Sequence, residues 1–125
     1  MTPLLFLLVC LFGSLGALCR WQLDLYLKKC RATRTPQWGI GVVNLLGCAC
    51  AGALAGFLAP NAPVFFLLST GFLGGFTTFS TAVLDAVMLL SHRRYLSAAG
   101  LVFGVWLGGS VLAICAFLLT SSFAM

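Results

Sequence analysis

Long apolar runs separated by short polar connections make up most of the chain. Four of these runs are each long enough to cross a bilayer core of about 30 Å as a helix. We expect spans over about 2–27, 38–59, 64–90 and 96–120, which together make residues 1–125 a single four-helix transmembrane domain. The pattern therefore predicts an all-α membrane protein with four transmembrane helices.

The third span has an unusual centre, because residues 71–81 combine three glycines with four hydroxyl side chains. Glycine lets a helix open, and hydroxyl groups satisfy the backbone groups that the opening frees. Irregular backbone at membrane depth survives only where protein buries it or where it lines a wet cavity. We therefore predict a third helix broken at its centre, beside a pore, an ion site or a tight subunit contact. A packing face through Gly71 and Gly75 is the alternative.

Composition supports the membrane class and narrows the chemistry. The 125 residues are 62% hydrophobic and 7% charged, with a mean hydropathy of +1.12. The chain has no G-x-x-x-x-G-K-[ST] nucleotide loop, so we expect passive or gradient-driven transport rather than an enzyme. Cysteines in or next to apolar runs are interpreted as small residues of helix faces, not as a disulfide framework or metal site. These are Cys10, Cys19, Cys48, Cys50 and Cys115.

The positive charges are confined to one side of the predicted bundle. All seven Lys and Arg residues fall in or near the connections between spans one and two and between spans three and four: Arg20, Lys28, Lys29, Arg31, Arg34, Arg93 and Arg94. By the positive-inside tendency, both basic loops are cytoplasmic and both termini lie outside, in a multi-pass protein of the cell membrane. The net charge of +5 thus reflects topology, and we expect no nucleic acid partner.

Buried polar groups that could carry function are few and neutral. They are Asn44 in the second span, Thr77, Thr78, Ser80 and Thr81 in the third, and Ser110 in the fourth. Amides and hydroxyls can replace the water around an ion without a fixed charge that would hold it too tightly. Hydrogen bonding between helices is the alternative. We favour that alternative for Ser110 considered alone, and we favour function for Asn44 opposite a broken helix.

Three side chains favour an anion pathway, although they do not name the anion. Phe79 lies among the hydroxyl groups, and the edge of a phenyl ring is the positive part of its quadrupole. Asn44 adds N–H donors, and Arg20 could attract anions to a pore mouth.

The same residues resemble the CrcB/Fluc fluoride channels. The resemblance rests on Gly74-Gly-Phe-Thr-Thr-Phe-Ser-Thr81, on Gly13-x-x-Gly16-Ala17-x-x-Arg20, and on Gly41-x-x-Asn44-x-x-Gly47, in that family's order and within its four-span length. It implies a passive channel that exports fluoride from the cytoplasm and so reduces its toxicity. It also implies an antiparallel dimer with two pores and a structural sodium ion at the dimer centre.

The resemblance implies specific roles, which we carry over residue by residue. The backbone carbonyls of Gly74 and Thr77 correspond to the sodium ligands. The pore groups correspond to Asn44, Phe79, Ser80 and Thr81, to which we add Ser110, and Arg20 corresponds to an arginine near the aqueous vestibule. Asp85 stands where family members often carry a glutamate.

One departure from the family pattern bears on assembly. The family's run usually places a second pore phenylalanine three residues after the first, but this chain has Ala82 there. A chain with all its basic residues on one side should also rarely insert in both orientations. We therefore predict a heterodimer with a related four-span subunit of opposite topology, which supplies the missing pore groups.

Two other function classes remain open at this point. A non-conducting structural or assembly subunit would keep the glycine-rich faces and lose pore residues such as the ring missing at Ala82. A small four-span drug–proton exchanger would need an acidic residue in the first span, and residues 2–19 have none.

Overall fold

Helices account for nearly all of the structure, a computed structural model that describes residues 2–30 and 38–124. Arg31, Arg34 and Pro36 of the predicted basic loop lie outside the described residues. The elements are α1 (Pro3–Cys30), α2 (Trp38–Phe57), α3 (Pro63–Phe66), η1 (Leu67–Leu73), α4 (Gly74–Phe76), α5 (Phe79–Ser91) and α6 (Tyr95–Ala124). Among the described residues there is no strand.

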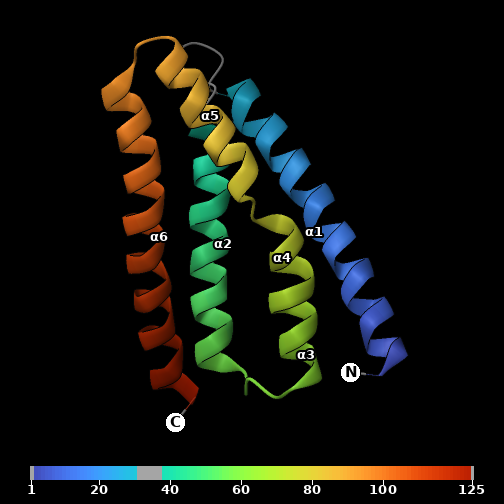
Figure 1. Cartoon of the computed structure of the whole chain (residues 1–125). Coiled ribbons are helices and arrows are strands. Elements are labelled where there is room, and N and C mark those ends of the chain that lie inside the picture. Colours follow the sequence, from blue (N-terminus) through green and yellow to red (C-terminus); the bar gives the residue numbers. More distant parts are fainter. Residues whose placement is uncertain (1, 31–37, 125) are drawn as a thin grey trace.

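Four helical segments are long and apolar enough to cross a membrane: Pro3–Lys29, Gly39–Phe57, Pro63–Ser91 and Tyr95–Phe123. The predicted all-α, four-span architecture is therefore confirmed. The third span consists of α3, η1 and α4, then an interruption, then α5. Figure 1 shows both described ends of the chain and the α2–α3 turn at one end of the bundle, with the α5–α6 turn at the other.

The helices pair in two groups, which the broken span joins. α2 packs most extensively against α6, and α1 packs mainly against η1 and α4. α5 turns away from the α1 group and packs on α6 instead. The two halves of the third span therefore belong to different helix pairs, and Figure 1 shows the chain changing direction between them.

Close contact between α2 and α6 depends on glycines of α2. A Cβ added at Gly52 would overlap with the carbonyl group of Ala113, and one added at Gly56 would lie 2.6 Å from the carbonyl oxygen of Phe117. Glycine at these positions lets the two backbones approach, which is how helices commonly pack within membranes. The sequence also spaces Gly100, Gly104 and Gly108 of α6 by four residues, a pattern that predicts a smooth ridge for close helix contact. Gly104 faces open space, since a Cβ there would meet nothing within 4 Å, whereas one at Gly108 would lie 3.3 Å from a leucine side chain of α2.

The contact of α1 with η1 and α4 explains why the third span is rich in glycine. A Cβ at Gly71 would lie 2.9 Å from Cβ of Phe12, and one at Gly75 would overlap with the carbonyl of Gly13. Gly16 of α1 faces the carbonyl of Phe72 in the same way. Gly71 and Gly75 thus form the packing face that was the alternative to a break, and the third span contains both the packing face and a break.

α5 is anchored on α6 by a small apolar core. Ala86, Leu89, Ala98 and Leu101 are buried against one another, and Val105 packs beside them. The turn between the two helices contains Arg93 in a left-handed conformation with φ of 57°. This short turn brings α6 back along α5, so α5 is held at the end of the bundle away from α3.

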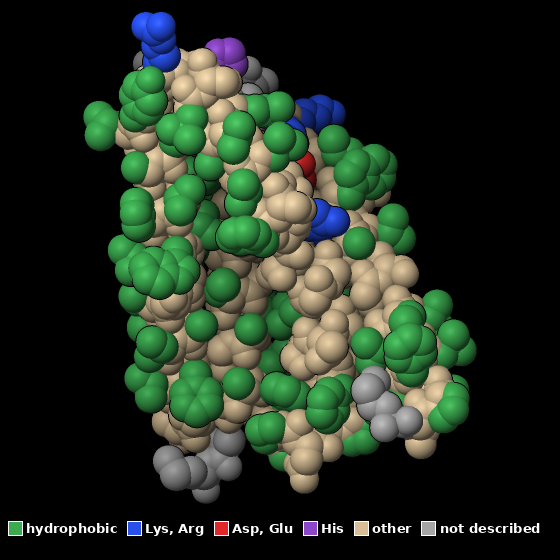
Figure 2. All heavy atoms as spheres, in the orientation of Figure 1, with side chains coloured by type: hydrophobic (Ala, Val, Ile, Leu, Met, Phe, Trp, Pro, Cys, Tyr) green, Lys and Arg blue, Asp and Glu red, His purple; other side chains and the backbone are tan. Residues whose placement is uncertain are grey.

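Large apolar side chains elsewhere face outwards, as lipid or a partner subunit requires. Leu96 is 91% exposed and Phe79 is 84% exposed. Figure 2 shows hydrophobic side chains over the whole height of the visible face, while the Lys, Arg and His side chains on that face lie in the half that holds the α5–α6 turn. The charged end and the apolar body are therefore separated along the bundle axis.

Candidate ion pathway at the broken third helix

The third span is interrupted at two residues, Thr77 and Thr78. Thr77 has φ −87° and ψ 154°, and Thr78 has φ −150° and ψ 130°, so both are extended. The helix ends at Phe76 and starts again at Phe79. The predicted break is confirmed, and it occupies a narrower stretch than the 71–81 region that the sequence indicated.

Asn44 of α2 holds the extended segment in place. Its Nδ2 donates to the carbonyl oxygen of Thr78 at 2.8 Å, and its Oδ1 accepts from the backbone N–H of Thr78 at 2.9 Å. The side chain is 9% exposed. A single amide thus pairs with both backbone polar groups of Thr78, at a part-buried position beside the groove described below.

This pairing leaves helix ends of opposite polarity facing the break. In a continuous helix the N–H of Thr78 would donate to the carbonyl of Gly74, but here it donates to Asn44. The first N–H groups of α5, beginning with Phe79, likewise have no preceding turn to donate to. The start of α5 therefore carries partial positive charge, and the freed carbonyls at the end of α4 carry partial negative charge.

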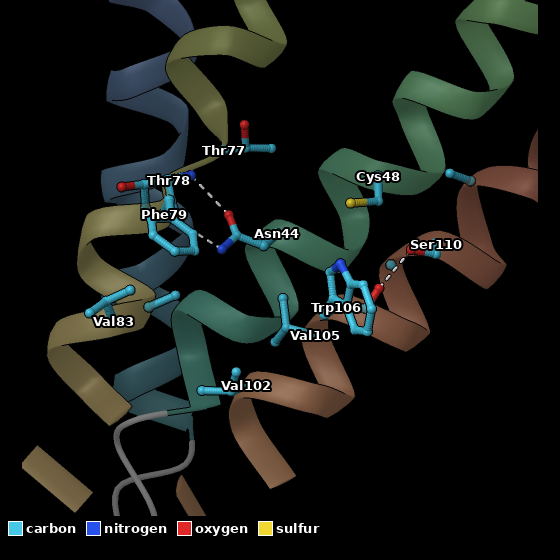
Figure 3. Close-up of a pocket in the computed structure, with 13 residues that line it drawn as sticks. Asn44, Cys48, Thr77, Thr78, Phe79, Val83, Val102, Val105, Trp106 and Ser110 are labelled. Atoms are coloured by element: carbon cyan, nitrogen blue, oxygen red, sulfur yellow. Dashed lines mark hydrogen bonds between the residues drawn. The ribbon is translucent and has the colours of Figure 1, made fainter. Parts of the chain in front are cut away.

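An open groove of about 520 Å³ lies beside the break, between α2, α5 and α6. The polar side chains that line it are Asn44, Thr77, Thr78 and Ser110, and the apolar lining includes Phe79, Ala82, Val83 and Val105. Figure 3 shows Asn44 pointing to Thr78 beside Phe79, with Trp106 and Ser110 facing from α6. The groove is thus mainly apolar with a few polar groups, which is typical of a selective binding site.

The structure brings some of the predicted pore residues together and leaves others outside the groove. Asn44, Phe79 and Ser110 line it, whereas Ser80 and Thr81, on the first turn of α5, do not. The Ser80 hydroxyl lies 3.2 Å from that of Thr78, and this pair connects it to the break. Ser80 is exposed, so its position faces the surroundings of the subunit.

Ser110 does not bridge two helices, which was the alternative that the sequence favoured for it. Its hydroxyl donates to the carbonyl of Trp106 at 2.8 Å, within α6. Ser110 nevertheless lines the groove, and its hydroxyl oxygen keeps its capacity to accept a hydrogen bond.

Among the groove residues that sequence reasoning did not assign to the pathway, Trp106 and Cys48 carry polar or polarisable side chains. Trp106 was overlooked because tryptophan in a membrane span is usually taken as an interfacial anchor. Its place one turn before Ser110 was the signal that could have identified it. Cys48, one turn after Asn44, lines both this groove and a smaller neighbouring one.

The smaller groove, about 270 Å³, lies on the other side of the break and includes both predicted sodium positions, Gly74 and Thr77. Gly74 is exposed, and a Cβ there would meet nothing closer than 4.0 Å. In a continuous helix its carbonyl would accept a hydrogen bond from the N–H of Thr78, but that N–H donates to Asn44 instead. The Gly74 oxygen is therefore available to a ligand. Backbone carbonyl oxygens can replace the hydration shell of a monovalent cation, so the free carbonyl of Gly74 has suitable chemistry for such an ion.

Arg20 lies apart from the groove, on α1. Its side chain is half-buried, and its Nε is buried without a hydrogen-bond partner in the described part of the chain. Arg20, which the sequence places near a vestibule, therefore forms no salt bridge with a carboxylate of the described residues.

Comparisons with known proteins agree on one family. Residues 7–118 match the family model described as CrcB-like protein, Camphor Resistance (CrcB). The chain is 39% identical over 130 residues to fluoride-specific ion channel FluC 1 of Leifsonia xyli, covering 90% of this chain and 93% of that protein. It is 42% identical over 106 residues to fluoride-specific ion channel FluC 3 of Bifidobacterium longum, covering 79% and 84%. It is 40% identical over 103 residues to fluoride-specific ion channel FluC of Dichelobacter nodosus, covering 80% and 82%.

Proposed function

Because the chain belongs to the CrcB family, we propose that it is a subunit of a fluoride-selective passive channel that exports fluoride from the cytoplasm. The observation that carries this function is the break at Thr77 and Thr78, which Asn44 holds open beside a groove lined by polar groups. Four membrane-spanning helices supply the frame for such a pore.

Fluoride suits a passive device. Hydrogen fluoride is a weak acid that enters cells as the neutral molecule and dissociates inside, so the anion accumulates. The membrane potential then favours expulsion by about 2.3 kcal/mol per charge per 100 mV. No chemical fuel is required, and export through such a channel lowers the toxic concentration of fluoride in the cytoplasm.

Asn44 and Phe79 have complementary tasks in this proposal. Asn44 uses one N–H bond for the carbonyl of Thr78, and its second amide N–H remains to meet a small anion in the groove. The exposed Phe79 ring can turn its positive edge toward the same anion. A narrow aromatic passage with a few fixed donors selects a small anion over larger halides.

The hydroxyl groups continue this path. Ser80 and Thr81 lie at the start of α5, where the helix end carries partial positive charge, and Ser110 lies across the groove on α6. Arg20 raises the local concentration of anions at the cytoplasmic mouth. In this proposal the anion meets only partial charges between mouth and exit, so it is never held tightly.

Sodium is proposed as a structural ion bound by the backbone carbonyls of Gly74 and Thr77. The exposed Gly74 and the interrupted hydrogen-bond pattern support this assignment. When bound, the ion supplies a fixed positive charge that joins the broken helices of two subunits. An antiparallel arrangement would bring Gly74 and Thr77 of each subunit to a common centre.

The partner in this proposal is a related four-span subunit of opposite topology. Its support is the location of all seven Lys and Arg residues on one side of the chain, together with Ala82 in the groove. Ala82 leaves an aliphatic methyl group where the family pattern places an aromatic ring. We propose that one of the two pores has been lost for want of this ring, and that the partner contributes the groups that complete the remaining pore.

The same alanine favours a second candidate function, a non-conducting subunit that only supports its partner. Replacing Asn44 and Phe79 in separate variants distinguishes the two functions. If fluoride flux through the assembled protein is unaffected by both changes, this chain is scaffolding.

Orientation follows from the proposed topology and can be measured directly. Tags at Met1 and Met125 are expected to react with a membrane-impermeant label added outside intact cells, because both termini are placed outside. A tag inserted beside Arg93 should react only after the cells are opened. Labelling of both terminal tags only from inside would contradict the orientation.

Fluoride tolerance of cells tests the function itself. In bacteria that lack their own fluoride exporters, the chain and its partner should restore growth in fluoride medium and lower intracellular fluoride. Growth on an equal concentration of chloride serves as the control, because chloride is not the proposed substrate. Expression in the membrane without any gain in tolerance would count against the export function.

A further inference from the structure

Three charged residues follow one another along a single face of α1: Arg20, Asp24 and Lys28. The spacing of four residues places each side chain next to the following one. Asp24 therefore has a cation within reach on both sides, and its choice of partner decides which cation stays unpaired. The number of basic residues alone does not show whether Asp24 pairs with Arg20 or with Lys28.

Asp24 is committed to Lys28. Its Oδ2 accepts a hydrogen bond from Nζ of Lys28 at 2.6 Å, and Asp24 is mostly buried, with 14% of its side chain exposed. Its Oδ1 points to α2, since a Cβ added at Gly39 would lie 2.7 Å from that oxygen, and this Oδ1 is buried without a hydrogen bond in the described residues. Gly39 is the second residue of α2, where the helix end is partially positive and favours a carboxylate.

Arg20 is left without a carboxylate partner. In the described residues the Asp24–Lys28 pair is the salt bridge that the structure contains, and Nε of Arg20 is buried without a hydrogen bond. An Arg–Asp pair four residues apart would otherwise form a strong, charge-assisted hydrogen bond. Such a pair would cancel the positive charge that an approaching anion meets at this site.

We propose that Lys28 is a positioning residue that draws Asp24 away from Arg20 and so keeps the Arg20 guanidinium available to fluoride at the cytoplasmic mouth. The proposal rests on the fluoride channel function. It gives Asp24 and Lys28, which lie outside the groove, a role in that function.

Replacing Lys28 with methionine tests this role against a matched control. In Lys28→Met, Asp24 turns to Arg20, and fluoride efflux from liposomes at low ionic strength is expected to fall about tenfold. Lys29→Met removes the same charge from the next, exposed position and should leave efflux near the wild-type rate. Raising the concentration of an impermeant salt should shrink the Lys28→Met defect, because the effect is electrostatic.

Rescue separates positioning from a structural role. The double variant Asp24→Asn/Lys28→Met removes the competing carboxylate, so its efflux should return to the wild-type rate. Asp24→Asn alone should conduct at least as fast as wild type. A defect in Lys28→Met that the double variant does not rescue, or a loss of efflux in Asp24→Asn, would overturn the proposal.

Wild-type efflux is measured first, in whichever assembly conducts, the chain alone or the pair. If the wild type passes no fluoride, the channel function fails and this proposal fails with it. If the wild type conducts and Lys28→Met behaves as Lys29→Met does, the channel function stands and Lys28 has no positioning role.

Discussion

Replacing Asn44 with alanine is expected to abolish fluoride efflux and to lower the thermal stability of the assembled protein. The change removes both hydrogen bonds that hold Thr78 and leaves a part-buried N–H and a part-buried carbonyl unpaired. Each unpaired group costs about 1–3 kcal/mol, so the break should collapse or rearrange. The groove would lose its principal amide donor at the same time.

The matched control is Asn61→Ala, which makes the same chemical change in the exposed turn between α2 and α3. Efflux from liposomes and the melting temperature in detergent are measured for both variants. Asn61→Ala should behave as wild type in both measurements. An Asn44→Ala channel with normal efflux would mean that this amide neither maintains the path nor contacts the ion.

The second large effect concerns assembly. Expressed alone, this chain is expected to give little conducting protein, because half the copies in an antiparallel dimer would have to insert with the seven basic residues outside. Expressed with a related four-span subunit of opposite charge bias, it should form a complex of one copy of each and conduct fluoride. Subunit composition by mass and efflux from the same preparation test both halves of this expectation.

Ala82→Phe in the paired complex probes the proposed loss of one pore. The groove has room beside Ala82, and a ring there would restore the aromatic passage that the family pattern contains. Efflux should rise by no more than the contribution of one further pore.

For the assembly prediction, a stable, fluoride-conducting homodimer of the unmodified chain would show that pairing with a different subunit is unnecessary.

The four spans and the broken third helix were predictable from the sequence because both depend on local composition. Apolar length alone identifies a span, and a cluster of glycine and hydroxyl residues marks a weak point in a helix. The position of the break was less predictable, since it depends on a side chain far away in the chain. Asn44 and Thr78 are separated by 34 residues, and their pairing fixes which residues leave the helix.

The glycines illustrate the same limit. Gly71 and Gly75 were weighed as either a hinge or a packing face, and they pack on α1 while the break occurs at Thr77 and Thr78. The regular spacing of glycines in α6 suggested a close helix contact, yet the space beside Gly104 is open. A closer approach uses Gly52 of α2 instead, which shows that spacing reveals a smooth face but not the neighbour that uses it.

Candidate pore residues were predicted by chemistry, whereas their grouping required the fold. Asn44, Phe79 and Ser110 come from three different helices, and only their packing places them around one groove. Helical spacing lets Asp24 reach either Arg20 or Lys28, and the order of acid before base only modestly favours Lys28, so the spacing alone does not settle the pairing. The contact of Asp24 with the start of α2 supplies the asymmetry.

Fluoride and chloride efflux from the same liposomes test the central claim most directly. Liposomes containing the assembled channel are loaded with both anions, a potassium ionophore sets the membrane potential, and selective electrodes record each ion as it leaves. Fluoride should leave rapidly while chloride stays at the rate of protein-free liposomes. Chloride efflux at a rate comparable to that of fluoride would contradict the assignment of this chain to a fluoride-selective pathway.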